Sequence, residues 1–248
     1  MYLWKYWRES RITFAVGVAL VGLLLWAVLK IHMGAFGPGQ PDDPSQLYLL
    51  IATPLTLPLG FLALRYGSFG VGSDLGRGSG SFLFSRPRSR AFFVWNDWSF
   101  GMAQLLLIVV AANLVLRLAV YRIAADSGPI LLNGGPVSMF SIFLLHCAAG
   151  LVLAGLIFGL TYFSSVLARG HGAMIAIGVL VAYSIAKSVV KHYWVDINLP
   201  DVSLIEFSRS RFGIGFADHL GLEIALRAAV ALAFPVAAQM LLQQRDVE

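Results

Sequence analysis

Charged residues are scarce in this chain. They make up 12% of its 248 residues, and the mean hydropathy is +0.77. Soluble domains are about one quarter charged, so a soluble core explains this composition poorly. Membrane-spanning helices explain it well, because each crossing needs about 20 predominantly apolar residues.

Cysteine and catalytic motifs are also lacking. The single cysteine, Cys147, lies in an apolar run, which excludes an internal disulfide framework and a thiolate metal cluster. There is no G-x-x-x-x-G-K-[ST] loop, HExxH motif, Ser-His-Asp set or pair of catalytic carboxylates. We therefore expect no catalytic residues, no metal ligands and no cofactor on this chain.

Long apolar runs are what the sequence does contain. They predict an all-α, polytopic membrane protein with six transmembrane helices and a single domain over residues 1–248. The first run follows Lys5, Arg8 and Arg11 without a small-residue cleavage site, so we expect a retained span and no signal peptide. The expected spans are about 12–32, 47–64, 99–120, 139–167, 173–190 and 219–242.

Basic residues predict the orientation. The net charge is +5, but the cations lie beside apolar segments instead of forming a polybasic face, so nucleic acid is not an expected partner. The connection at 65–98 is short and rich in arginine, where the positive-inside rule weighs most. We expect this connection and both termini in the cytoplasm, and the protein in a bacterial inner membrane. The arginines are Arg65, Arg77, Arg86, Arg88 and Arg90.

The most informative part of this connection is residues 74–90. Ser79 or Ser81 can cap a helical turn over residues 82–84, which Pro87 would end. Exposed aromatic side chains between arginines suit a docking surface, because they anchor a partner while the charges orient it. The alternative is an ordinary connector whose apolar triplet packs under the bundle.

The order of residues in this segment has a recognisable pattern: an acid, Gly-Ser four and five positions on, a hydrophobic triplet, Ser-Arg-Pro, and an Arg three positions after the proline. It resembles the loop between the second and third spans of type-two ABC exporter permeases. That family commonly has Glu and Thr where Asp74 and Ser79 stand, and usually a Lys where this chain has Asn96-Asp97. The residues in register are Asp74, Gly78, Ser79, Phe82, Leu83, Phe84, Ser85, Arg86, Pro87 and Arg90.

Both ends of the chain extend the resemblance. Residues 1–11 look like the amphipathic helix that leads into the first span of these permeases, although Trp4, Tyr6 and Trp7 also suit an aromatic belt at the membrane interface. Gln244-Arg-Asp-Val resembles the family's common Arg-Asp ending. The similarities cover nearly the whole expected topology.

The resemblance implies a permease that contacts membrane lipids and forms a homo- or heterodimer with a second permease subunit. It also implies a nucleotide-binding ATPase subunit on another chain, which would hold ATP and Mg. The triplet at 82–84 would be a cytoplasmic coupling helix that carries ATPase motion into the spans. Such coupling requires the ATP-bound partner to bind two permease states differently. The residues in register above, apart from Ser85, would form the ATPase-coupling interface.

Polar residues in or near the spans are candidates for a substrate path, because polar groups in hydrocarbon tend to face protein or water. They are Asn113, Arg117, Glu223 and Arg227. Glu223 and Arg227 are four residues apart, so a local ion pair is the alternative for them. Residues 191–218 mix aromatic and charged side chains, which predicts either a re-entrant or surface-lying outer segment or a simple extracellular loop.

Two other functions stay open. A haem- or metal-binding membrane redox subunit would use histidines, but only His146 lies well inside an expected span. Such a protein would carry a Soret band or bound metal. A non-transporting membrane scaffold or immunity protein would bind a partner without stimulating ATP turnover.

Overall fold

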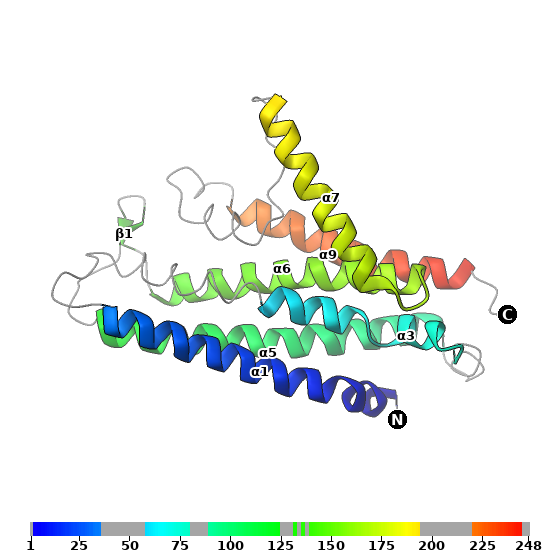
Figure 1. Ribbon diagram of the computed structural model, residues 1–248, viewed down its shortest axis with the longest axis horizontal. Coiled ribbons are helices and arrows are strands. Elements are labelled where there is room, and N and C mark those ends of the chain that lie inside the picture. The colour runs from blue at the N-terminus through cyan, green and yellow to red at the C-terminus, as the bar shows by residue number, and fades with distance from the viewer. Residues whose placement is uncertain are drawn as a thin grey trace.

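The fold is a bundle of long helices, of which α1, α5, α6 and α9 run lengthwise while α7 projects away (Figure 1). The computed structural model describes residues 2–35, 58–79, 89–124, 131–132, 135–136, 139–193 and 220–244. Its elements are α1 (Tyr2–Ala35), a helix over residues 58–67, α3 (Val71–Gly76), α5 (Arg90–Ala124), β1 (Leu131–Leu132), β2 (Gly135–Pro136), α6 (Met139–Leu167), α7 (Gly172–Tyr193) and α9 (Leu220–Gln244).

Five of these helices are long and apolar enough to cross a membrane, and they correspond to five of the six expected spans. The expected span at 47–64 lies mostly outside the described residues, although residues 58–67 are helical. The chain is therefore a polytopic helical membrane protein, as predicted. The qualifying stretches are Trp4–Ala27, Arg90–Leu118, His146–Leu167, Gly172–Val190 and Ile224–Gln244.

The third long helix begins earlier than the apolar run predicts. The expected boundary near Ser99 is wrong, because α5 starts at Arg90. The polar residues at the start of α5 lower the hydropathy there, but Phe93, Val94 and Trp98 are all buried. Part of the connection expected at 65–98 is thus packed helix. Residues 2–11, which were expected to form a helix leading into the first span, are continuous with that span in α1.

The central helix is α6. It packs against α3, α5, α7 and α9, and 61% of its apolar stretch is buried, compared with 6% for α7. Aromatic side chains fill the space around it: Phe158 stacks on Trp98 of α5 with ring centroids 4.9 Å apart, and Tyr162 is fully buried one turn further on. The apolar surface of α7 is left facing outward, as a membrane-embedded helix permits.

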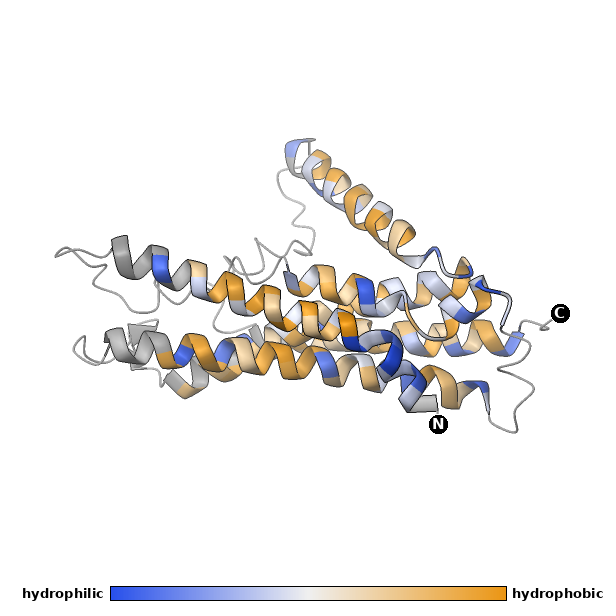
Figure 2. Ribbon diagram, turned by 60° about the horizontal axis from the view of Figure 1, so that its bottom comes forward, coloured by the Kyte–Doolittle hydropathy of each residue, from blue (hydrophilic) through white to orange (hydrophobic). Residues whose placement is uncertain are grey.

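One end of the bundle gathers the start of α1, α3, the start of α5 and the end of α9 (Figure 1). Figure 2 shows many hydrophilic residues at this end and hydrophobic ones along the helices. The Arg90 guanidinium donates a hydrogen bond to the backbone carbonyl of Leu242, so the start of α5 is tied to the end of α9. We call this region the polar end.

A short antiparallel pair departs from the all-helical expectation. β1 and β2 lie between α5 and α6, with Leu131 opposite Pro136 and Leu132 opposite Gly135. The expected spans left residues 121–138 as a connection. The pair is too short to form a sheet layer, so the fold remains helical in the part of the chain that the structure describes.

The close contact between α6 and α7 at Gly172 predicts a stability effect. A Cβ atom at Gly172 would lie 2.4 Å from both the Ser165 nitrogen and the Thr161 oxygen, whereas a Cβ atom at Gly178 would meet nothing within 4 Å. We expect Gly172→Ala to destabilise the protein by about 1–3 kcal/mol, because the backbones must separate. Gly178→Ala is the matched control in the same helix and should leave the thermal midpoint in detergent unchanged or slightly raised. Equal midpoints for the two variants would contradict the packing.

Candidate functional site

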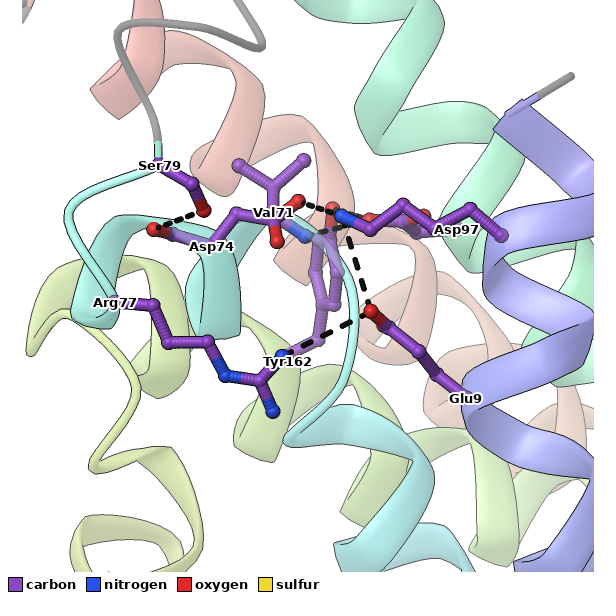
Figure 3. A network of polar contacts seen from close by, with 8 residues as sticks. Glu9, Val71, Asp74, Arg77, Ser79, Asp97 and Tyr162 are labelled. Carbon is purple, nitrogen blue, oxygen red and sulfur yellow. Dashed lines mark hydrogen bonds and ion pairs between the residues drawn. The ribbon is translucent and has the colours of Figure 1, made fainter.

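The candidate site is the short helix α3 and the contacts that hold it at the polar end (Figure 3). The backbone amide of its first residue, Val71, has no acceptor within the helix, because the first amides of any helix lack an intrahelical partner. The residue before it, Gly70, provides no side-chain cap. Instead, the Val71 amide donates to Asp97 Oδ2 of α5 over 2.8 Å, so α3 is capped by a carboxylate from another helix.

Asp97 is fully buried, which makes its hydrogen bonds necessary. A buried carboxylate costs several kcal/mol unless donors surround it. The Tyr162 hydroxyl of α6 donates to the same oxygen over 3.3 Å. Asp97 therefore links α3, α5 and α6 at one point.

The turn before α3 accommodates this carboxylate because of Gly70. Its φ angle is +75°, a left-handed conformation that glycine adopts without steric cost. A Cβ atom there would lie 2.1 Å from Asp97 Oδ2, far closer than carbon and oxygen atoms can approach without a clash. Both the backbone angle and the space require glycine at this position.

The end of α3 forms a Schellman motif. Gly78 has a φ angle of +74°, its amide donates to the Leu75 carbonyl over 3.3 Å, and the Ser79 amide donates to the Asp74 carbonyl over 3.0 Å. The Ser79 hydroxyl donates to the same carbonyl over 3.1 Å. Gly78 and Ser79, which were expected at a docking interface, thus end α3. The turn that Ser79 was expected to cap lies outside the described residues.

Ion pairs join α3 to α1. Asp74 is 3% exposed, and its carboxylate accepts a charge-assisted hydrogen bond from Lys5. Glu9 Oε1 lies 3.9 Å from Lys5 Nζ and 3.8 Å from Arg77 Nη1. The Lys5–Asp74 pair is the stronger one because it is mostly out of water, whereas Arg77 is 65% exposed and its pair is a surface contact. Two cations and two anions alternate, so the network is neutral as a whole.

The other residues expected at the interface lie elsewhere or are not described. Arg90 is half-buried at the start of α5 and donates a hydrogen bond to the Leu242 carbonyl, so it connects α5 to α9. The remaining ones fall outside the described residues; they are Phe82, Leu83, Phe84, Arg86 and Pro87.

The residues expected along a substrate path are spread over two helices. Asn113 of α5 is buried and donates to the Val109 carbonyl over 2.8 Å. One turn on, the Arg117 guanidinium lies over Phe140 and Phe143 of α6, 5.6 and 5.7 Å from their centroids. Arg227 lies on α9 and is half-buried, and the side chain of Glu223 lies outside the described part of the chain. The ion-pair alternative for these two residues is therefore untested.

The arrangement connects α1, α3, α5 and α6 through hydrogen bonds and ion pairs. Besides Asp74, these contacts depend on four residues that the sequence did not predict to be site residues. They are Lys5, Glu9, Asp97 and Tyr162. Asp97 offered one signal, an acid inside a helix apolar enough to span a membrane, which requires a buried partner. Over the described ranges, no three His, Cys, Asp or Glu side chains lie close enough to hold a metal ion.

The Asp97 cap predicts a specific pattern of amide protection. Asp97→Ala leaves the buried Val71 amide without this acceptor, so we expect a loss of about 1–3 kcal/mol and faster hydrogen exchange in residues 70–76. Asp97→Asn is the matched control, because its amide oxygen can still accept from Val71. Hydrogen exchange with mass spectrometry in detergent measures both. If the two variants exchange alike, the cap does not hold α3.

The Lys5–Asp74 pair predicts a coupling energy. Asp74→Asn and Lys5→Gln should each destabilise the protein by about 2 kcal/mol, less than a fully buried pair would show, because Lys5 is partly exposed. The double variant should lose less than the sum, since removing both partners leaves no unpaired buried charge. Chemical unfolding in detergent measures the cycle, and strict additivity would show that the pair contributes nothing.

Comparison with known proteins identifies no relative. No protein-family model matches the chain, and no curated protein or solved structure matches it. The resemblance of residues 74–90 to exporter permeases therefore stays a hypothesis that rests on the sequence.

Proposed function

We propose that this chain is the membrane-spanning permease subunit of an ABC-type exporter, which pairs with a nucleotide-binding ATPase subunit and with a second permease subunit. The ATPase subunit binds ATP and Mg, and this chain provides the substrate path and the docking segment. Export as the direction of transport follows from the resemblance.

The observation that carries the proposal is how the docking segment is anchored. Residues 80–88 leave from α3 and return to the start of α5. On one side, α3 is tied to α1 by Lys5 and to α5 and α6 through Asp97. On the other side, Arg90 is tied to the end of α9. A partner that moved this segment would therefore act on four long helices at once, as coupling to ATP hydrolysis requires.

Charge supports a cytoplasmic position for the polar end. Basic residues at this end come from α1, the segment around α3, the start of α5 and the turn after α6. An excess of Lys and Arg beside membrane helices is typical of the cytoplasmic side. They include Lys5, Arg8, Arg11, Arg65, Arg77, Arg90 and Arg169.

The substrate path is proposed along α5 and α9. Asn113 and Arg117 share one face of α5, and Arg227 lies on α9, which packs against the same helix. Aromatic rings hold the Arg117 guanidinium by cation–π contact, which lets a cation persist among apolar side chains. A positive group in this position would favour an anionic or polar substrate.

The docking segment predicts the effect of a charge among its apolar side chains. Phe82→Asp or Phe84→Asp should lower the amount of Walker-motif ATPase that co-purifies from native membranes by at least tenfold, because a docking anchor becomes a charge that resists burial. Membrane insertion should be unchanged. Affinity purification in mild detergent, mass spectrometry and an ATPase assay on the eluate measure the loss.

Ser89→Asp is the matched control for this experiment. Ser89 is exposed beside the segment, and its hydroxyl accepts from the Phe92 amide at the start of α5, a capping role that Asp also fills. It adds the same charge without removing an apolar anchor, so ATPase recovery should stay near the wild-type level. Unchanged recovery with Phe82→Asp and Phe84→Asp would sink the docking proposal. A partner without ATPase activity would favour the scaffold function instead.

A further inference from the structure

One face of α1 exposes two arginines and a tryptophan at the polar end. Trp4 is 61% exposed, and the Arg8 guanidinium lies 5.0 Å from the centroid of its ring. Arg11 is exposed and lies three residues beyond Arg8, so both guanidinium groups project from the same side of the helix. The stacked indole limits the positions available to the Arg8 side chain.

These arginines differ from the neighbouring cations in having no acidic partner among the residues that the structure describes. Lys5 pairs with Asp74 and Glu9, and Arg77 pairs with Glu9. Neither Arg8 nor Arg11 forms an ion pair with any acid in the described ranges. The acids of this region are thus committed to the inner face of α1, and the outer face keeps two positive charges.

The surface adjoining the arginines is apolar. Ile12, Val16 and Leu23 continue the same outer face and are 68%, 49% and 61% exposed. They belong to the stretch Trp4–Ala27, which is long and apolar enough to cross a membrane. The acyl chains of a lipid can therefore lie along this apolar surface, next to the guanidinium groups. Trp4 is at the start of the apolar stretch, where tryptophan is typical of the interface between membrane and water.

We propose that Trp4, Arg8 and Arg11 form a binding site for the headgroup of an anionic phospholipid, whose acyl chains lie along the outer face of α1. The guanidinium groups match phosphate oxygens in charge and geometry, and they can bind them through paired N–H donors. Only a ligand with both a phosphate headgroup and apolar chains satisfies the two arginines and the stripe below them together. The site does not depend on the exporter function, because a headgroup binds whether or not an ATPase docks.

Native mass spectrometry of the full chain tests the proposal with two lipids in competition. The purified protein is mixed with equal amounts of phosphatidylglycerol and phosphatidylcholine in detergent, and the ratio of bound lipids is measured. Removing one charge by Arg8→Gln or Arg11→Gln should lower the preference for phosphatidylglycerol about fivefold, and removing both should lower it further. Arg8→Lys/Arg11→Lys keeps the charge and should retain most of the preference.

Arg65→Gln is the control for net charge. Arg65 is exposed on the helix at 58–67, near the same end, and its guanidinium lies over Phe69. Its loss should leave the lipid ratio unchanged. An equal loss in this variant, or an unchanged ratio in Arg8→Gln/Arg11→Gln, would overturn the site. Loss of self-association in place of lipid binding would assign the face to a second copy of the chain and would also overturn the proposal.

Discussion

A buried carboxylate needs hydrogen-bond donors, and at Asp97 the Val71 amide and the Tyr162 hydroxyl both donate to Oδ2. The position of α3 follows from these bonds, because the first amide of that short helix has its acceptor on α5. The left-handed turn at Gly70 follows as well, since any side chain there would occupy the place of the carboxylate. Two hydrogen bonds among apolar side chains thus fix the start of α3 against α5 and α6.

The ion pair between Lys5 and Asp74 adds α1 to this arrangement. Together with the bond from Arg90 to the end of α9, it makes the polar end a region where four long helices share a few polar contacts. Such contacts are directional, unlike the apolar packing along the helices, so a displacement of α3 changes its contacts with α1 and α5 together. This is the property that the proposed docking segment between α3 and α5 would need.

The charged residues on the two sides of α1 differ in their surroundings. Lys5 and Glu9 face α3 and are neutralised within the protein, whereas Arg8 and Arg11 face outward beside an apolar stripe. Burial separates the two roles, because the side chains of Lys5 and Glu9 are 30% and 19% exposed, whereas Arg8 and Arg11 are exposed. An inner ion pair and an outer headgroup site can therefore coexist within two helical turns.

The sequence by itself determined the membrane class and five of the long helices, because runs of apolar residues long enough to cross hydrocarbon have no other common use. It also marked residues 74–90 as unusual, through their arginines and aromatic triplet. Only the tertiary structure decided that Asp74, Gly78 and Ser79 build and end α3, and that α5 begins at Arg90. The physical reason is that hydropathy averages over neighbours in the chain, whereas the roles of Asp97, Tyr162 and Lys5 depend on partners 26, 65 and 69 residues away.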